Sequence, residues 1–289
     1  ISLIIYDIQD VGARFYTYIT TLGLVMEAAA ENGIPVLVLD RPNPLGGEKI
    51  EGPILDLDHQ SFVGYYPIPI RYGMTIGELA KMIVGEKWIR AIPELDVIEM
   101  SGWDRSMYFD DTGLTWVKPS PNIPDIETAI IYSGMCLVEG TNISEGRGTD
   151  HPFKYIGAPW MAEEVCMDLQ GMKKLKGVEF IKRKFRPRPI KGVVNSPKYD
   201  GKSCIGFKVR VKDRAQYNSV LVGVQALYTV RNLTPWKLQL KEKHLNRLWG
   251  NDKLTKVLND KLALAELLST LDKDRTTFVQ KRTPYLLYE

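Results

Sequence analysis

The sequence predicts an α/β protein built on a parallel sheet, within a chain of two domains. Residues 2–6 and 35–39 are continuous apolar runs rich in β-branched side chains, typical of strands that are buried on both faces of a parallel sheet. Between them, residues 13–32 carry apolar side chains at helical spacing and stop at Gly33. This is a β-α-β unit, and a chain of 289 residues with 44% hydrophobic residues can bury a sizeable core around it.

The next elements follow from shorter patterns. A third strand is expected at residues 67–72. A helix is expected to open at Thr75, because Glu78 follows at the spacing of a capping box. Residues 95–100 read as a fourth strand, and residues 129–137 as a helix or a passage from helix to strand. These elements extend the first unit toward a glycine-rich stretch.

The pattern changes near residue 152, where Pro152, Gly157 and Pro159 interrupt it. We therefore expect one domain at residues 1–152 and a second, smaller α+β domain at residues 153–289. In the second domain, helices are expected at 161–169, 220–230 and 254–271, and strands at 178–185 and 205–211.

The composition argues against several function classes. A net charge of only +3 does not suit a dedicated nucleic-acid binder, and the basic stretch 173–191 is better explained as a strand with one solvated face. Cys136, Cys166 and Cys204 are too far apart for a disulfide framework or a zinc site. No run approaches the roughly 20 apolar residues that span a bilayer. We expect no metal, no cofactor, no nucleic-acid partner and no membrane span.

Polar side chains gather in the loops that follow the expected strands and in the glycine-rich stretch. In open α/β sheets the ligand lies beyond the carboxyl ends of the strands, so these loops are expected to face one cleft. The side chains that they offer are carboxylates, amides, guanidinium groups and tyrosines: Asp7, Asp10, Glu145, Gln9, Asn43, Asn142, Arg14, Arg41, Arg71, Arg147, Tyr16 and Tyr18.

This mixture of side chains suits a sugar ligand. Sugar hydroxyls take paired hydrogen bonds from planar side chains, sugar rings pack on aromatic rings, and an acidic sugar requires arginine. Hydrolysis of a glycosidic bond further requires two carboxyl groups across that bond. A nucleotide-dependent enzyme is a weaker alternative, because neither a G-x-G-x-x-G turn nor a P-loop occurs.

Each candidate also has a structural alternative. Asp10 can cap the helix that follows it, and Asp7 can be a satisfied structural carboxylate. The tyrosines can pack in the core, and two prolines give residues 41–44 a turn interpretation. A flexible surface loop can explain residues 139–149.

Several stretches carry a more specific signal. They are DIQDVGARFYTYITTL (7–22), VLDRPNPLGG (38–47), EGP (51–53), PIPIRYGMTIGELA (67–80), Trp103 and Arg105 with DDTGLTWVKPSPNIP (110–124), EGTNISEGRGT (139–149), GAPW (157–160) and RTPYLLY (282–288). In this order they resemble the NamZ-type exo-β-N-acetylmuramidases, formerly a domain of unknown function.

The resemblance implies a Rossmann-like domain with a smaller auxiliary domain and an active cleft at their junction. It implies removal of β-1,4-linked N-acetylmuramic acid from the non-reducing ends of peptidoglycan fragments. We expect Asp10, Glu145 and Asp7 in the catalytic group, with Asp7 and Gln9 orienting the other carboxyl groups. Substrate binding is expected from Gln9, Arg14, Tyr16, Tyr18, Arg41, Asn43, Arg71, Asn142 and Arg147, with an arginine holding the lactyl carboxylate. A non-catalytic cell-wall sugar-binding protein is the alternative.

Two features depart from the family pattern. Members usually carry a further stretch ahead of the position of Ile1, including a Pro-Glu-His-Gly loop whose glutamate is a candidate for catalysis, and this chain starts without Met. We therefore expect it to be part of a longer enzyme, located in the cell envelope rather than the cytoplasm. The pair Asp150 and His151 stands where a Thr and a basic residue are expected.

Overall fold

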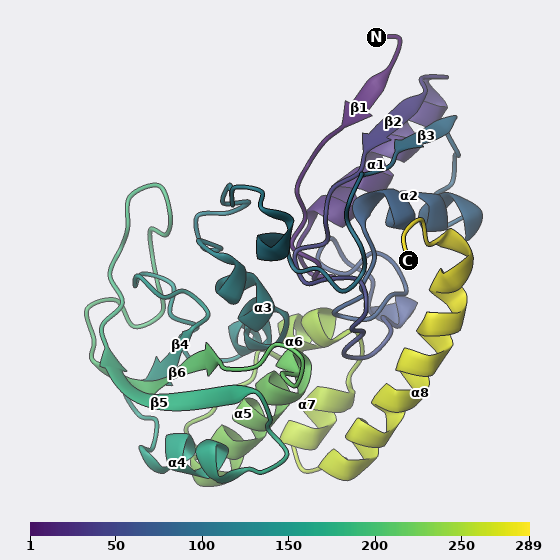
Figure 1. The fold of residues 1–289 in the computed structure, drawn as a ribbon. Coiled ribbons are helices and arrows are strands. Elements are labelled where there is room, and N and C mark those ends of the chain that lie inside the picture. The colour runs from purple at the N-terminus through teal and green to yellow at the C-terminus, as the bar shows by residue number, and fades with distance from the viewer. The chain divides into compact units, whose positions relative to one another are not determined.

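A computed structural model describes residues 1–289, which divide into two compact units (Figure 1). Unit 1 comprises Ile1–Pro119 and Leu271–Glu289, and unit 2 comprises Ser120–Thr270. The boundary expected at residue 152 therefore falls inside unit 2. The reason is that helix α3 (Ile126–Met135) packs on α5 (Ser219–Leu233), so the segment before residue 152 belongs with the residues after it.

Unit 1 contains the predicted parallel sheet. Strands β1 (Ile4–Tyr6), β2 (Val36–Leu39) and β3 (Leu95–Ile98) lie side by side in the order β1-β2-β3. Both pairings are parallel, so the carboxyl ends of the three strands lie at one edge of the sheet. Helix α1 (Tyr18–Glu31) connects β1 to β2, and the β-α-β unit is confirmed.

Helix α2 (Ile76–Gly85) starts where the sequence predicted. Thr75 accepts a hydrogen bond from the Glu78 backbone at 3.2 Å, and the Glu78 side chain accepts one from the Thr75 backbone at 3.0 Å. This capping box satisfies two N–H groups that the helix geometry leaves without partners. The buried face of α2 joins a core that includes Met26 of α1 and Val38 of β2.

The third strand expected at residues 67–72 is wrong. Pro67 and Pro69 carry no N–H group and cannot donate to a strand ladder, so the segment forms isolated bridges of Arg71 with Ala13 and Glu51 in place of a strand. These bridges join three loops of unit 1.

Unit 2 is an antiparallel sheet with helices, as expected for an α+β domain. Strand β6 (Cys204–Val211) lies between β4 (Tyr155–Ala158) and β5 (Val178–Phe185). The basic residues of β5 lie on an edge strand, where Lys182 and Lys184 both reach Glu163. The remaining helices of the chain are α4 (Glu164–Gly171), α6 (Glu242–Trp249), α7 (Lys253–Leu258) and α8 (Leu264–Arg282), with short 3-10 turns at Leu57–His59, Phe109–Thr112, Cys136–Gly140 and Thr283–Tyr285.

The single helix expected at residues 254–271 is wrong, because the chain forms α7 and α8 instead. Asp260, between them, has φ +58, a left-handed conformation that ends a helix. Strand β4 and helix α6 were not expected. Gly157 looked like an interruption, but it lies within β4 and pairs with Gly206 of β6. A Cβ at Gly157 would come within 2.5 Å of the Ile205 carbonyl oxygen, so the close approach of β6 requires glycine there.

Candidate functional site

Asp7 and Arg41 form an accessible ion pair at the carboxyl ends of β1 and β2. The Arg41 Nε donates to Asp7 Oδ1 at 2.6 Å, and the two side chains are 38% and 44% exposed. The terminal guanidinium nitrogens of Arg41 make no hydrogen bond within the chain. Asp7 therefore orients a guanidinium whose outer edge is available to the two oxygens of an anion.

Gln9 connects the loops that follow these two strands. Its Nε2 donates to the Asp10 carbonyl at 2.9 Å and to the Pro42 carbonyl at 3.0 Å. Gln9 thus bonds two backbone carbonyls and no side-chain carboxylate, so its expected role in orienting the catalytic carboxyl groups stays a prediction.

Asp10 is buried, with 2% of its surface exposed. Its Oδ2 accepts hydrogen bonds from the Tyr72 hydroxyl at 2.5 Å and the Gly12 backbone at 2.7 Å, and Oδ1 has no partner. Burial raises the pKa of Asp10 to about 6, although both hydrogen bonds oppose the shift. Because α1 begins only at Tyr18, Asp10 does not cap it.

Arg14 and Arg71 are fully enclosed in unit 1. Arg14 donates to the carbonyls of Pro53 and Ile68 at 2.8 and 2.7 Å. Arg71 pairs with the buried Glu51 at 2.9 Å and also reaches a loop carbonyl. Both guanidinium groups are therefore engaged by protein partners, which gives each of them a structural position in unit 1.

Asn43 is also buried and bonded within the chain. Its amide donates to the Met74 carbonyl at 2.8 Å and accepts from the Leu45 backbone at 2.9 Å. Gly12 packs directly against it, because a Cβ at Gly12 would lie 2.3 Å from the Asn43 Oδ1. Asn43 also opens a turn, because the Gly46 backbone donates to its carbonyl at 3.0 Å, so its side chain has a structural position.

Tyr16 and Tyr18 lie together at the start of α1, both partly buried. Their rings meet edge to face at 4.9 Å, and both hydroxyls donate to the Pro119 carbonyl, at 2.8 and 3.2 Å. Burial raises the pKa of Tyr16, so its hydroxyl stays protonated. Both tyrosines thereby bind the backbone at Pro119, the last residue of the first chain segment of unit 1.

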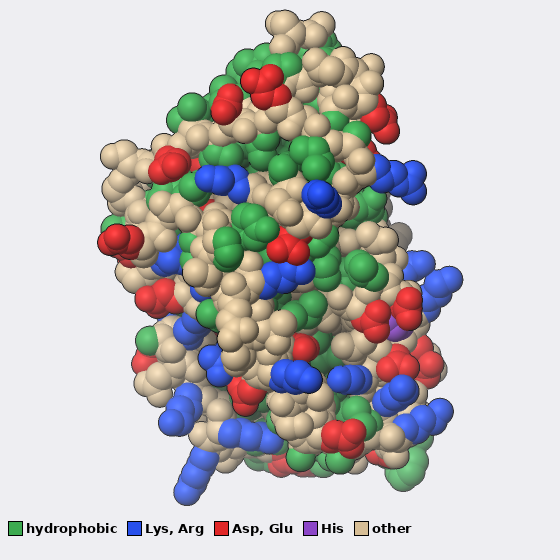
Figure 2. All heavy atoms as spheres, turned by 90° about the vertical axis from the view of Figure 1, so that its right-hand side faces the viewer, with side chains coloured by type: hydrophobic (Ala, Val, Ile, Leu, Met, Phe, Trp, Pro, Cys, Tyr) green, Lys and Arg blue, Asp and Glu red, His purple; other side chains and the backbone are tan.

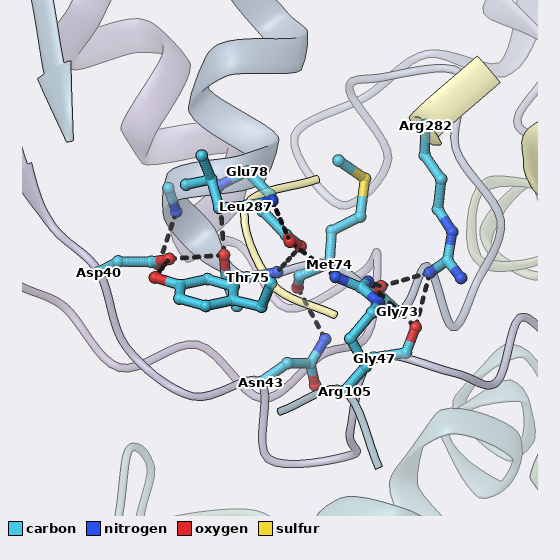
Figure 3. Close-up of polar contacts among 12 residues, drawn as sticks. Asp40, Asn43, Gly47, Gly73, Met74, Thr75, Glu78, Arg105, Arg282 and Leu287 are labelled. Carbon is cyan, nitrogen blue, oxygen red and sulfur yellow. Dashed lines mark hydrogen bonds and ion pairs between the residues drawn. The ribbon is translucent and has the colours of Figure 1, made fainter. Parts of the chain in front are cut away.

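Asp40, directly before Arg41, is the centre of a buried hydrogen-bond network (Figure 3). Its carboxylate accepts from the Thr75 hydroxyl and the Gly77 backbone, both at 2.7 Å, and from Tyr288 at 2.7 Å. Burial raises the pKa of Asp40 and these donors lower it, so the net shift is upward. The network fixes the backbone from which Arg41 projects.

The C-terminal tail is fastened to the same edge of the sheet. The Leu287 backbone donates to Glu78 at 2.9 Å, as does the Arg105 side chain at 2.6 Å (Figure 3). The Tyr288 hydroxyl accepts from the Met100 backbone at 2.9 Å while it donates to Asp40. Tyr288 does not follow a strand, so the strand-end pattern did not predict it. The sequence indicated Tyr288 only through the stretch RTPYLLY (282–288) that resembles the family.

The glycine-rich stretch of unit 2 carries a separate charged cluster. Glu145 is 5% exposed and lies 2.9 Å from the Lys198 Nζ and 3.8 Å from the Arg147 Nε. Arg147 donates twice to Glu139, at 3.1 and 2.7 Å. A Cβ at Gly146 would lie 2.6 Å from the Tyr155 carbonyl oxygen, so this stretch is packed and not a loose surface loop. Lys198, 53 residues further along the chain than Glu145, was not anticipated.

Asn142 has a structural position beside this cluster. It donates to the Lys237 carbonyl and accepts from the Gln239 backbone, both at 2.9 Å. The predicted residues thus form two groups, one in each unit. Their assembly into one cleft, and every catalytic or binding role, stay predictions.

Other features of the molecule bear on ligand classes. On the face shown in Figure 2, acidic and basic side chains are interspersed. No three His, Cys, Asp or Glu side chains are grouped to hold a metal ion. None of the helices combines the length and apolar character needed to cross a membrane.

Two family models match the chain over nearly its whole length. "Exo-beta-N-acetylmuramidase NamZ, N-terminal" matches residues 1–127, and "Exo-beta-N-acetylmuramidase NamZ, C-terminal" matches residues 130–288. The peptidoglycan beta-N-acetylmuramidase NamZ of Bacillus subtilis (strain 168) is 42% identical over 289 residues, which are 100% of this chain and 68% of that protein.

Two crystal structures of DUF1343 family proteins from Bacteroides fragilis NCTC 9343 are also similar. One has a TM-score of 0.91 and 31% sequence identity, and the match covers 100% of this chain and 75% of that one. The other has a TM-score of 0.82 and 32% identity, and the match covers 100% of this chain and 76% of that one. Both likenesses extend over both units.

Proposed function

Because this chain belongs to the NamZ family of exo-β-N-acetylmuramidases, we propose that it removes N-acetylmuramic acid from the non-reducing end of peptidoglycan fragments. The family decides between the enzyme and the non-catalytic sugar-binding protein that the sequence left open, since its members are glycosidases. The observation that carries the proposed substrate is the Asp7–Arg41 pair at the carboxyl ends of β1 and β2.

N-acetylmuramic acid differs from N-acetylglucosamine by a lactyl carboxylate, which needs a cation to bind it. Arg41 suits this role because Asp7 holds its Nε and leaves the other two nitrogens available for a bidentate contact. Arg14 already donates to two backbone carbonyls, and Arg71 is paired with Glu51. Arg147 already uses its Nε and one terminal nitrogen on Glu139. Arg41 is thus the best placed of the four candidate arginines.

Asp10 and Glu145 are the carboxyl groups that we propose for the hydrolytic step. An acid that protonates the leaving oxygen has to keep its proton near neutral pH, and the raised pKa of Asp10 supports that role. Glu145, ion-paired with Lys198, is proposed as the second carboxylate. The variants Asp10→Asn and Glu145→Gln are expected to bind the saccharide while losing hydrolysis.

The test uses the intact protein and two disaccharides of opposite order. N-acetylmuramyl-β-1,4-N-acetylglucosamine is expected to be split, and N-acetylglucosaminyl-β-1,4-N-acetylmuramic acid is expected to stay intact, as followed by mass spectrometry. Cleavage of the second disaccharide alone, or of neither, contradicts the proposal.

We also propose a location in the cell envelope, because peptidoglycan lies outside the cytoplasmic membrane. Fractionation of the source cells followed by immunoblotting tests this. Recovery of the protein in the periplasmic or secreted fraction is expected, and recovery only in the cytoplasm contradicts it.

A further inference from the structure

We propose that a cavity at the ends of β2 and β3 binds the uncharged amino sugar from which N-acetylmuramic acid is released. The inference rests on the proposed function and assigns a place to the second half of its substrate. The cavity has a volume of about 330 Å³. Nine residues line it, among them Pro42, Met100, Ser101, Trp103, Asp111 and Leu114.

The position of the cavity connects it to Arg41. Pro42 lines the cavity and directly follows Arg41 after β2, while Met100 and Ser101 follow the neighbouring strand β3. The carboxyl ends of parallel strands are where open α/β sheets bind ligands. The volume is near the lower end of ligand pockets, roughly 300–1,000 Å³, so it suits a single sugar ring.

The charge of the lining selects between the two sugars of peptidoglycan. None of the nine lining residues is a lysine or arginine, and Asp111 contributes a carboxylate. A lactyl carboxylate placed here would meet a like charge and no cation. The cavity therefore suits N-acetylglucosamine, whereas the outer edge of Arg41 suits N-acetylmuramic acid.

The lining also offers the contacts that an acetamido sugar uses. Met100, Met107 and Leu114 provide apolar surface for the acetamido methyl group, and Ser101 and Asp111 can bond hydroxyls. Leu114 is 53% exposed in the loop after Gly113, so it can cover a ring that enters the cavity.

The C-terminal tail supports this cavity and the Arg41 site together. Tyr288 packs edge to face on Trp103 at 5.1 Å and accepts from the Met100 backbone, and both of these residues line the cavity. The same hydroxyl donates to Asp40, which precedes Arg41. One side chain thereby contacts both the cavity lining and the residue that precedes Arg41.

The test compares two substrates that differ only in what leaves. The intact protein and its Leu114→Ala, Ser101→Ala and double variants are assayed on N-acetylmuramyl-β-1,4-N-acetylglucosamine and on β-N-acetylmuramyl fluoride. The fluoride leaving group is too small to fill the cavity. Val117→Ala is the matched control, because Val117 is 77% exposed in the same loop and does not line the cavity.

On the disaccharide, the double variant is expected to lose about tenfold in kcat/KM, mainly through KM, as removal of a few apolar contacts from a pocket does. On the fluoride, the kcat/KM of every variant is expected to stay within about twofold of the wild-type value. The kcat/KM of the control Val117→Ala is expected to stay within the same range on both substrates. Equal losses on both substrates, or none on the disaccharide, overturn the cavity assignment alone. A wild-type protein that cleaves neither substrate overturns the proposed function and the cavity assignment with it.

Discussion

The burial of the arginines predicts that Arg71 and Arg41 have opposite mutant phenotypes. Arg71 is 1% exposed and pairs with Glu51, which is 5% exposed, at 2.9 Å. Arg71→Met deprives a buried carboxylate of its guanidinium, a change that costs about 3–5 kcal/mol of unfolding free energy. The Arg41–Asp7 pair is exposed, so Arg41→Met is expected to cost only about 0.2–1 kcal/mol.

Urea unfolding followed by circular dichroism measures both free energies. Arg41→Met is expected to unfold like wild type and to lose preference for N-acetylmuramyl over N-acetylglucosaminyl substrates. The double variant Arg71→Met with Glu51→Gln is expected to recover part of the lost stability, because the buried carboxylate charge is also removed. Equal losses of stability in Arg71→Met and Arg41→Met would refute the assignment of Arg71 to the fold.

Three further predictions concern the network around the sheet edge. Thr75→Val removes a helix cap and a hydrogen bond to Asp40, so urea unfolding should show a loss of about 2–4 kcal/mol, and Thr75→Ser should show little. The Asp10 carboxyl should titrate near pH 6 in an NMR experiment, and a midpoint near 4 contradicts its burial. Burial raises the pKa of Asp10 from 3.8 to about 6. The contribution of Asp10 to the free energy of unfolding is therefore expected to be highest below about pH 4 and about 3 kcal/mol lower above pH 6. Tyr288→Phe removes the hydrogen bonds to Asp40 and to the Met100 backbone, so it is expected to lower the free energy of unfolding in urea by about 1–3 kcal/mol. An unchanged unfolding midpoint would contradict the role of Tyr288 in supporting this network.

The elements that the sequence predicted well are those in which local pattern and burial agree. The apolar strands at 2–6 and 35–39, and the Thr75 capping box, are local features with a direct physical signal. The prediction at 67–72 counted apolar residues but ignored that two prolines cannot donate to a ladder. Helix α6 had a usable signal in its buried leucines and the glycine that ends it.

The candidate site was predictable where side chains follow strand ends. Asp7 and Arg41 emerged because parallel strands bring their ends together, and the ion pair between them follows from that topology. Burial could not be inferred from residue type, so Arg14 appeared equivalent to Arg41. Lys198 pairs with Glu145, and Tyr288 bonds Asp40. Both partners lie far away in the sequence, so no local sequence pattern predicts these contacts.

The central claim is that Arg41, held by Asp7, recognises the lactyl carboxylate of N-acetylmuramic acid. A crystal structure of the intact protein with this sugar bound tests it most directly. The claim predicts both carboxylate oxygens within hydrogen-bond distance of the Arg41 terminal nitrogens, with the Asp7 contact kept. A carboxylate bound by other side chains, with Arg41 facing solvent, would contradict it.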